Sequence, residues 1–215
     1  MYLFIYDGYK KKDMTSDQLV KKVLYIFKEN IFKENTFADS GKSLSWEILR
    51  TEKGRPFFKN APVAFSVSHS GNLWVCLMNK GKETVGVDVQ KIDGRDHGKL
   101  VERYFSTNEK SLLKNKDNKR VFAEIWTRKE ALAKALGTGL TGEVLSYDTA
   151  SACNAIFDTE KKQDGNAIFF NGAADDIVHR KNCIFKNIYI SEDYACTCFI
   201  PDRSYDIKKI NISRQ

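Results

Sequence analysis

The sequence lacks the marks of a secreted or membrane-spanning protein. Its 215 residues include five cysteines, an odd number without a Cys-x-x-Cys pair, which argues against a disulfide framework and a zinc ribbon. No apolar run approaches the roughly 20 residues that a membrane span needs. The N-terminus lacks the basic start and the long apolar stretch of a signal peptide. We therefore expect a cytoplasmic protein in a reducing compartment, without a membrane partner.

Common motifs for catalysis and nucleotide binding are also missing. The chain has no Walker phosphate loop, no Gly-x-Gly-x-x-Gly fingerprint and no Gly-x-Ser-x-Gly elbow of the serine hydrolases. Its histidines and cysteines do not occur at a zinc-binding spacing. No recognised nucleic-acid-binding motif is present and the basic residues are dispersed, so we expect no nucleic-acid partner.

Positive charge is in excess. The 35 Lys and Arg residues outnumber the 28 Asp and Glu residues, which gives a net charge of +7. Residues 91–120 alone hold nine basic and five acidic residues. A solvated basic surface is the simplest explanation, and an anionic partner is the alternative. Hydrophobic residues make up 42% of the chain, which is enough for a packed core.

Apolar periodicity predicts a mixture of helices and strands, and hence an α+β protein. Capping-box patterns begin a helix at Thr15, which ends near residue 30, and a short helix at Ser106. The strongest helical pattern covers 118–136, with Asp117 as N-cap and Gly137 as stop. Strands are expected at 2–6, 46–49, 63–67, 73–78, 84–90, 144–147, 152–157, 166–170, 184–190 and 194–200. The three strands between 63 and 90 suggest an antiparallel meander, and 206–215 a mobile polar tail.

Two stretches of the chain resemble each other weakly. Residues 68–77 and 191–199 each run from a serine through a polar turn to an aromatic residue and a cysteine-containing apolar strand. This repeat predicts a pseudo-dimer of two similar halves, each a small, mostly antiparallel sheet packed with a long helix. We place the halves at 1–92 and 93–215, and expect them to pack tightly because no linker separates them.

The long predicted helix carries charges close to its apolar face. At about 100° per residue, Lys129 falls inside the apolar sector, while Glu130 and Lys134 stack one turn apart at its edge. One interpretation is a routine ion pair between Glu130 and Lys134, with Lys129 reaching out to solvent. The other is that these charges face a functional cleft.

The strand predicted at 84–90 alternates between two faces. Its valines share one face, and Gly86, Asp88 and Gln90 share the other. Gly86 leaves room for something to approach the backbone. Asp88 and Gln90, together with Glu130, would form an oxygen-only donor set that suits Mg²⁺. The alternative is that Asp88 lies on the solvated face of a half-buried sheet.

Ser68 and His69 end a predicted strand just before a glycine turn. A hydroxyl and an imidazole there can both bind phosphate oxygens. A serine hydrolase is disfavoured, because adjacent residues do not generally reach nucleophile–base geometry. The alternative for His69 is a capping or core-edge histidine.

Four motifs, in this order, resemble those of the 4′-phosphopantetheinyl transferases. They are Gly54-Arg55-Pro56, Phe65-Ser-Val-Ser68-His69-Ser-Gly71, Gly86-Val87-Asp88 and Trp126-Thr-Arg-Lys129-Glu130-Ala-Leu-Ala-Lys134. The chain length is similar to that of the surfactin-synthetase-activating branch, whose members are pseudo-dimers of two α+β halves in one chain. The resemblance implies an active site between the halves, in a protein that we expect to act as a monomer.

The resemblance also implies a reaction. The phosphopantetheine arm of coenzyme A moves onto a serine of an apo acyl or peptidyl carrier protein, and adenosine 3′,5′-bisphosphate is released. Asp88, Gln90 and Glu130 would hold Mg²⁺ against the pyrophosphate. Lys134 would contact a phosphate oxygen and stabilise charge on the leaving side. Glu130, or a metal-bound water beside it, would remove the serine proton.

Further roles follow from the same resemblance. Ser68 and His69 would bind the 3′-phosphate of coenzyme A, with Arg55 and Pro56 near its adenine end. Glu109 occupies a position where some family members place a catalytic acid near the metal. Its alternative role is in the capping box of the short helix.

Gln90 departs from the family pattern, because many members have a glutamate there. A neutral amide still offers a carbonyl oxygen but removes one negative charge, so we expect weaker metal affinity rather than inactivity. The alternative function is a catalytically weak module that binds coenzyme A or a carrier protein. Carrier proteins of this kind are acidic, which makes the basic segment 91–120 the expected docking surface.

Overall fold

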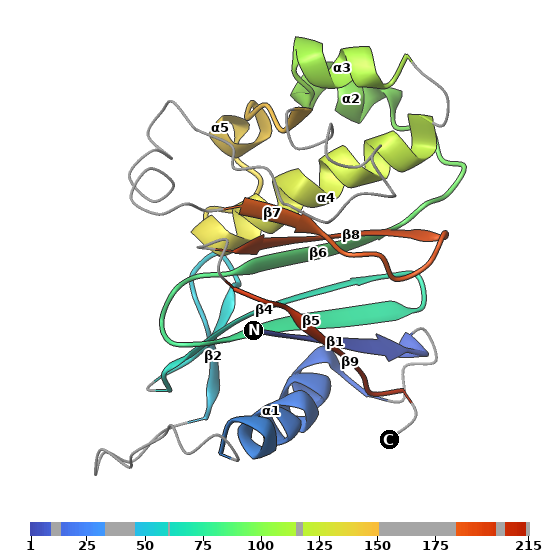
Figure 1. Ribbon diagram of the computed structural model, residues 1–215. Helices are drawn as coiled ribbons and strands as arrows, with labels where there is room; N and C mark the ends of the chain where they lie inside the picture. Colours follow the sequence, from blue (N-terminus) through green and yellow to red (C-terminus); the bar gives the residue numbers. More distant parts are fainter. Residues whose placement is uncertain are drawn as a thin grey trace.

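The computed structural model describes residues 1–9, 14–32, 46–59, 61–114, 118–150, 184–200 and 205–213. The strands expected at 152–157 and 166–170, and the N-cap expected at Asp117, lie outside these residues. Helix α1, a first sheet, a second sheet and helix α4 follow one another as layers, with the helices on the outside (Figure 1).

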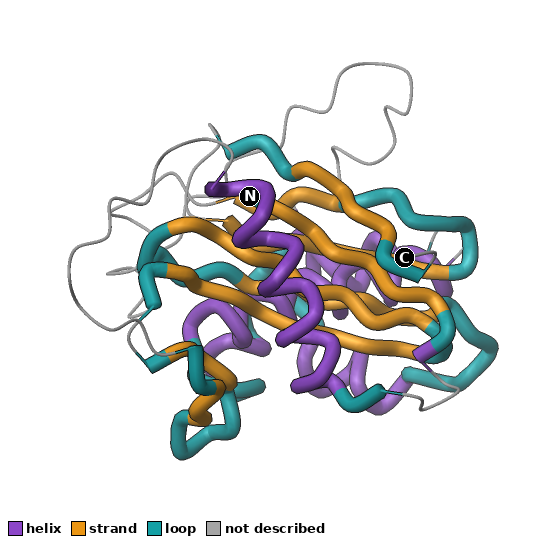
Figure 2. Tube along the Cα trace, turned by 90° about the horizontal axis from the view of Figure 1, so that it is seen from below, coloured by secondary structure: helices purple, strands orange, loops and turns teal. Residues whose placement is uncertain are grey.

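The first sheet has the strand order β4-β5-β1-β9. Its strands are β1 (Tyr2–Asp7), β4 (Val63–Ser70), β5 (Leu73–Lys80) and β9 (Lys208–Asn211). β5 pairs antiparallel with both β4 and β1, which confirms the hairpin predicted at 63–78. Helix α1 (Ser16–Phe32) crosses the outer face of this sheet (Figure 2). It begins at the predicted capping box, where the Thr15 N–H donates to Gln18 Oε1 at 2.7 Å.

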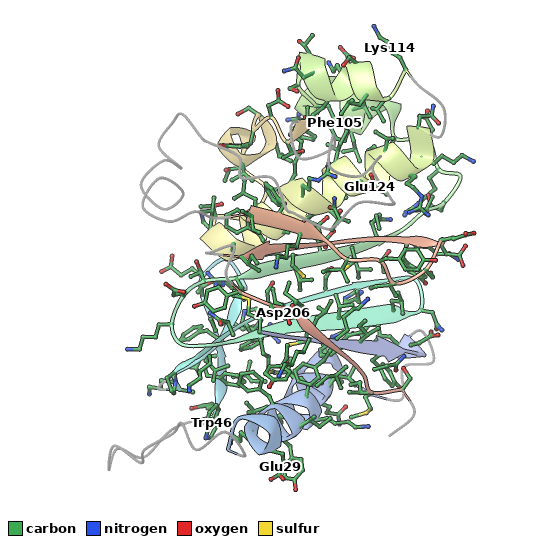
Figure 3. All side chains as sticks on the ribbon, viewed as in Figure 1. Glu29, Trp46, Phe105, Lys114, Glu124 and Asp206 are labelled. Carbon is green, nitrogen blue, oxygen red and sulfur yellow. The ribbon has the colours of Figure 1, made fainter. Side chains whose placement is uncertain are left out.

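The apolar residues of α1 that the sequence placed at helical spacing form the outer core of the molecule. Together with strand residues of the first sheet they are fully or almost fully buried, namely Leu19, Val20, Val23, Leu24, Phe27, Phe4 and Trp74. Trp46 lies beside α1 and extends this core (Figure 3). Its ring contacts Phe58 edge to face, and Lys28 Nζ lies 3.7 Å from the ring centroid.

The C-terminal segment is a strand, so the prediction of a mobile polar tail from residue 206 is wrong. β9 pairs in parallel with β1, from Tyr2 with Lys208 to Ile5 with Asn211. Ile212 is fully buried, and its N–H donates to Ile5 O at 2.9 Å. The physical reason is that the exposed edge of β1 offers backbone groups that β9 satisfies.

The second sheet has the strand order β6-β8-β7 and is antiparallel throughout. Its strands are β6 (Gly86–Lys91), β7 (Ile184–Asn187) and β8 (Tyr194–Ile200). The predicted meander is therefore wrong in its third strand, because β6 leaves the first sheet and pairs with β8. The valines of β6 face the core between the two sheets, and its opposite face receives helix α4 (Asn118–Leu136).

The inner core lies where the two sheets face each other. Alternate residues of the first sheet meet alternate residues of the second, namely Leu3, Ile5, Leu73, Val75 and Leu77 with Val85, Val87, Val89, Cys196, Cys198 and Ile200. The two strands of the sequence repeat, β5 and β8, each lie inside their own sheet, between two neighbours. The α+β prediction is confirmed. The division into 1–92 and 93–215 stays a prediction, and the structure places β6 in the second sheet and β9 in the first.

Short elements complete the fold. They are the hairpin of β2 (Ile48–Arg50) and β3 (Pro56–Phe58), and the helices α2 (Gly98–Tyr104), α3 (Thr107–Leu112) and α5 (Gly142–Leu145). α3 begins with the capping box predicted at Ser106. The strand expected near 144–147 is wrong. Thr141 caps a helical turn there, because its hydroxyl accepts the Val144 N–H. No helix in the described part of the chain is both long and apolar enough to cross a bilayer.

Candidate active site

Gly86 lets the backbone of β6 touch the backbone of α4. A Cβ atom at this position would lie 1.8 Å from Ala131 O, a distance that real side chains essentially never show, and 3.0 Å from Ala135 N. The room that the sequence predicted beside Gly86 is thus occupied by the helix itself. This close approach brings the polar face of β6 under the part of α4 that carries Glu130 and Lys134.

Asp88 is the centre of the polar cluster at this contact. Its side chain is 6% exposed, and Oδ1 accepts two hydrogen bonds. Lys134 Nζ donates to this oxygen at 2.7 Å, and the Ser68 hydroxyl donates to it at 2.6 Å. The alternative of a solvated Asp88 is therefore excluded. Lys134 forms its ion pair with Asp88, across the helix–sheet contact, rather than a routine pair along the helix.

Glu130 lies close enough to Asp88 for the two charges to interact. Burial raises the pKa of Glu130 above its ordinary value, the Asp88 charge raises it further, and Lys134 partly opposes both. Two carboxylates that repel each other inside a half-buried site form an attractive place for a cation. Among the described residues, no group of three or more His, Cys, Asp or Glu side chains could hold a metal.

Two carboxylates nevertheless fit Mg²⁺. This ion commonly takes only one or two protein carboxylates and completes its octahedral shell with water and substrate phosphates. Gln90 follows Asp88 on the same face of β6, and its amide nitrogen donates to Lys91 O at 3.0 Å. Of the three predicted metal ligands, the structure brings Asp88 and Glu130 close together. The Gln90 amide is instead hydrogen-bonded to the carbonyl oxygen of Lys91.

A pocket of about 220 Å³ opens beside this cluster. Its wall combines residues of the β2–β3 hairpin, of β4, of α4 and of the loop after α4. They are Lys53, Gly54, Arg55, Pro56, Phe65, Ser66, Val67, Glu130, Ala133, Lys134, Gly137, Gly139 and Leu140. Three of the residues predicted to bind coenzyme A therefore line one pocket: Arg55, Pro56 and Lys134. A mixture of cationic and apolar walls suits a ligand with phosphates and an organic body.

Arg55 also closes the C-terminal end of α4. Its Nη1 donates to Ala135 O at 3.0 Å, and its side chain packs over Gly137, which ends the helix with a φ of +69° as predicted. Lys53 Nζ donates to Thr138 O at 3.1 Å. Burial lowers the pKa of the Arg55 guanidinium. The β2–β3 hairpin is thus fastened to the helix end that borders the pocket.

Ser68 and His69 point to different surroundings, as neighbours in a strand must. Ser68 is 7% exposed and hydrogen-bonded to Asp88, whereas His69 is exposed, with its ring 4.9 Å from that of Tyr9. His69 does not line the pocket. The predicted Ser68–His69 pair is therefore divided between the buried cluster and the surface.

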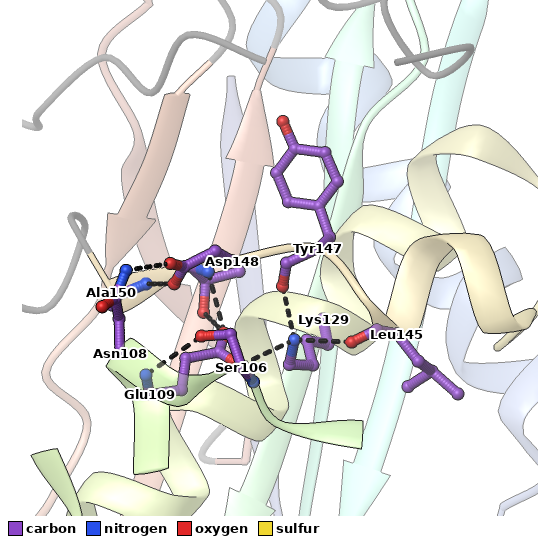
Figure 4. A network of polar contacts seen from close by, with 9 residues as sticks. Ser106, Asn108, Glu109, Lys129, Leu145, Tyr147, Asp148 and Ala150 are labelled. Carbon is purple, nitrogen blue, oxygen red and sulfur yellow. Dashed lines mark hydrogen bonds and ion pairs between the residues drawn. The ribbon is translucent and has the colours of Figure 1, made fainter. Parts of the chain in front are cut away.

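Glu109 lies away from this cluster, in a second polar network (Figure 4). It is fully buried and pairs with Lys129 Nζ at 2.9 Å. One carboxylate oxygen accepts both the Thr149 N–H and the Thr149 hydroxyl at 2.8 Å, and the other accepts the Ser106 N–H, which completes the capping box. The structure thus shows the capping-box role that was the alternative for Glu109, and its catalytic role stays a prediction.

Lys129 follows neither of the two interpretations that its position suggested. It does not reach solvent, since its side chain is 0% exposed, and it does not face the pocket. Its ammonium donates to the carbonyl oxygens of Leu145 and Tyr147, the first at 2.8 Å, in addition to its pair with Glu109. Burial lowers the pKa of Lys129, although Glu109 acts in the opposite direction. The residue joins α4 to α3 and to the segment after α5.

Several residues of the site were not anticipated. Lys53 and Leu140 line the pocket, and Ser66 and Ser70 extend the contact of Ser68 with β6. The Ser-x-Ser-x-Ser alternation at 66–70 was the available signal, since period-two spacing puts all three hydroxyls on one face of a strand. Nothing in the sequence around Leu140 distinguished it from other loop residues.

Comparison with known proteins agrees with the motifs. Residues 84–198, more than half of the chain, match the family model of the 4′-phosphopantetheinyl transferase superfamily. The chain therefore belongs to the 4′-phosphopantetheinyl transferase superfamily, and the resemblance inferred from its motifs is confirmed at that level.

Individual relatives match over part of the chain. The chain is 30% identical over 167 residues to the 4′-phosphopantetheinyl transferase gsp of Aneurinibacillus migulanus. This match covers 75% of the chain and 63% of the relative. The chain is 34% identical over 108 residues to 4′-phosphopantetheinyl transferase AcpT of Salmonella typhi, covering 48% of this chain and 55% of the relative. In both cases the match spans less than two thirds of the relative's own length.

One solved structure that the chain matches is the holo-[acyl-carrier-protein] synthase of Thermotoga maritima. The similarity has a TM-score of 0.35 at 23% sequence identity and covers 56% of this chain and 63% of that one.

Proposed function

We propose that this protein transfers the 4′-phosphopantetheine arm of coenzyme A to a serine of an apo acyl or peptidyl carrier protein, with Mg²⁺, and releases adenosine 3′,5′-bisphosphate. The observation that carries the proposal is the convergence of Asp88, Glu130 and Lys134 at the border of the pocket that Arg55 and Pro56 line. Two acids and a cation at one pocket are the groups that cleavage of a pyrophosphate requires.

Each residue has a role in this proposal. Asp88 and Glu130 would hold the metal, which when bound would neutralise the pyrophosphate charge. Lys134 contacts a phosphate oxygen and stabilises the charge that develops on the adenosine bisphosphate as the phosphorus–oxygen bond of the pyrophosphate breaks. The carrier serine oxygen forms the new bond to phosphorus, and its proton passes to Glu130.

Coenzyme A is the proposed co-substrate, and the residues that line the pocket support this choice. Arg55 and Pro56 lie near its adenine end in this proposal, and the exposed imidazole of His69 is available for the 3′-phosphate. The apolar wall of Phe65, Val67 and Leu140 supports uncharged parts of the ligand.

The experiment that tests the function is transfer to a carrier. The protein is incubated with coenzyme A, Mg²⁺ and several apo carrier proteins, and the carrier mass is measured. We expect an increase by one phosphopantetheine arm, lost in Asp88→Ala and kept in Asp17→Ala, which removes a carboxylate of α1 that pairs with Arg50. Full activity of Asp88→Ala would overturn the metal assignment.

A second candidate function follows from Gln90, whose neutral amide is held by Lys91 O. A site with one less negative charge favours a catalytically weak module that binds coenzyme A or a carrier protein. Tight binding of coenzyme A without transfer to any carrier would support this alternative and contradict the proposed transferase activity.

The proposed partner is an acidic carrier that docks on the basic segment 91–120, where Lys99 and Arg103 of α2 are exposed. Neutralising both to serine should raise the KM for the carrier and weaken its salt dependence, because electrostatic steering would be lost. Neutralising Lys208 and Lys209, also exposed but on β9, is the charge-matched control. Equal effects of the two pairs would exclude a local docking surface at α2.

The proposal also places the protein in the cytoplasm, as a monomer. The buried, unpaired thiols of Cys76, Cys196 and Cys198 support a reducing compartment. Sedimentation at micromolar concentration tests the monomer, and a concentration-dependent increase in mass would contradict it.

A further inference from the structure

Strand β4 is joined to β6 by side chains rather than by a backbone ladder. The hydroxyl oxygens of Ser66, Ser68 and Ser70 accept the N–H groups of Val87, Val89 and Lys91, at 3.1, 3.3 and 2.9 Å. The three contacts repeat at every second residue of both strands. They connect the edge of the first sheet to the edge of the second, directly beside the proposed site.

Ser68 differs from the other two serines in what its hydroxyl proton does. That proton is donated to Asp88 Oδ1 at 2.6 Å, while the same oxygen accepts the Val89 N–H. A serine has only one O–H to donate. A phosphate at neutral pH offers mainly acceptors, so Ser68 could donate to one only by releasing Asp88. At 7% exposure, it is also poorly placed for a ligand that enters from solvent.

The bond from Ser68 determines which oxygen of Asp88 remains available. Ser68 and Lys134 both bind Oδ1, and within the described residues the Asp88 carboxylate has no other hydrogen bond. Oδ2 is thus left for a further ligand. A carboxylate that is held through one oxygen keeps its orientation and presents the other oxygen to a metal.

We infer that Ser68 is a positioning residue that orients Asp88 for a divalent cation, rather than a ligand of the coenzyme A 3′-phosphate. The inference rests on the proposed function, because it needs a cation at Asp88 and Glu130. It leaves His69 as the member of the Ser68–His69 pair that can reach a phosphate, since its side chain is exposed.

The test compares Ser68→Ala with Ser70→Ala. Both variants lose one hydroxyl contact to a backbone N–H of β6, but only Ser68→Ala also loses the bond to Asp88. Two quantities are measured. The first is Mn²⁺ binding to the protein, followed by electron paramagnetic resonance of the free ion. The second is the ratio of kcat/KM for coenzyme A to kcat/KM for 3′-dephospho-coenzyme A.

We expect Ser68→Ala to bind Mn²⁺ about 10-fold more weakly, since losing the partner of a metal ligand typically weakens affinity by roughly 10- to 100-fold. Ser70→Ala should bind Mn²⁺ like the unmodified protein. Ser68→Thr, which keeps a hydroxyl, should recover most of the affinity. The preference for coenzyme A over its dephospho form should remain unchanged in Ser68→Ala and fall in His69→Ala.

Three results would overturn the inference. The first is a Ser68→Ala variant with normal Mn²⁺ binding and a lost preference for the 3′-phosphate, which would make Ser68 a phosphate ligand. The second is an equal loss of Mn²⁺ affinity in Ser68→Ala and Ser70→Ala, which would make the effect one of folding. The third is an unmodified protein that binds no Mn²⁺, in which case the proposed metal site itself fails and the inference falls with it.

Discussion

Glu130 shows how a single side chain in the site is set by its neighbours. Burial and the Asp88 charge both favour the protonated form, and Lys134 favours the carboxylate. The pKa of Glu130 in the folded protein is raised above its ordinary value of 4.5, so the folded protein binds this proton more tightly than the unfolded chain does. The resulting stabilisation of the fold is fully present below about pH 4.5. It is lost as the pH rises through the raised pKa. Because a cation at the proposed site would need the carboxylate, we expect the acid limit of metal binding at a higher pH than for an ordinary glutamate.

Removing the neighbours of Glu130 one at a time should move its pKa in opposite directions. Asp88→Asn removes a repelling charge and is expected to lower the pKa of Glu130. Lys134→Met removes an attracting charge and is expected to raise it. Carbon-13 NMR of labelled glutamate side chains in metal-free protein measures both shifts. Asp17→Asn, on α1, should leave the Glu130 titration unchanged, and shifts of the same sign in the two site variants would contradict the prediction.

Lys129 of α4 and Glu109 of α3 form a charged pair that is completely buried. Both side chains are 0% exposed, and each is also hydrogen-bonded to backbone groups of the segment around residues 145–149. Removing one member of such a pair leaves the other charge buried without its ion-pair partner. Removing both charges together is far less harmful.

We expect Lys129→Met to lower the free energy of unfolding by about 3–5 kcal/mol. The double variant Glu109→Gln with Lys129→Met should lose less than the sum of the two single variants, as urea denaturation would show. Lys110→Met, which removes the exposed pair with Glu102, should change stability by no more than about 1 kcal/mol. Strict additivity of the two buried substitutions would refute the coupling.

At the scale of elements, α4 is placed by contacts along its whole length. Its backbone touches β6 at Gly86, and the hydroxyl of Thr127 lies 2.9 Å from that of Thr197 on β8. Phe122 stacks on the rings of His97 and Phe105. Phe105 lies in the chain between α2 and α3. The helix therefore cannot shift along the sheet without losing contacts at several points. This rigidity keeps Lys134 within hydrogen-bonding distance of Asp88.

Gly86→Ala should disrupt this arrangement, because the new methyl group would lie 1.8 Å from Ala131 O. We expect a loss of about 1–3 kcal/mol or more in unfolding free energy, typical of an overpacked core. Mn²⁺ binding should weaken as well, since α4 must move away from Asp88. Gly142→Ala is the matched control: nothing lies within 4 Å of its Cβ, and stability should change by at most about 1 kcal/mol. Equal stability of the two variants would contradict the close packing.

At the scale of the whole molecule, each of the two sheets combines strands from distant parts of the chain. β9 returns to the first sheet beside β1, and the Met1 amino group donates to Asp206 O at 3.0 Å. β6, which follows β5 in the sequence, joins the second sheet instead. The two layers are thus held together by the chain path as well as by the shared core between the sheets.

Ile212 tests whether the C-terminal segment is part of the fold. It is fully buried in the outer core, so Ile212→Ala is expected to lower the unfolding free energy by about 2–5 kcal/mol in urea titrations. Lys209→Ala, an exposed change on β9, should have almost no effect. An Ile212→Ala variant as stable as the unmodified protein would restore the polar tail that the sequence suggested.

Much of this architecture was predictable from local patterns, because those patterns depend on near neighbours in the chain. The predicted helix at 118–136 has the observed bounds of α4, and the capping boxes at Thr15 and Ser106 both form. The short apolar strand expected near 144–147 failed because Thr141 caps a helical turn there. Polar composition misled the prediction for β9, since pairing with a distant strand can outweigh it.

The sequence by itself determined helices α1, α3 and α4, most strands, the valine face of β6 and the candidate residues of the site, because periodicity and motif spacing depend on consecutive residues. Tertiary structure decided which of those residues meet. The packing of α4 on Gly86 brings Lys134 to Asp88, and the contact of β4 with β6 brings Ser68 to the same carboxylate. The contact of α4 with α3 places Glu109 and Lys129 in a separate network. These contacts join residues 20 or more positions apart, and their distances depend on how the layers stack.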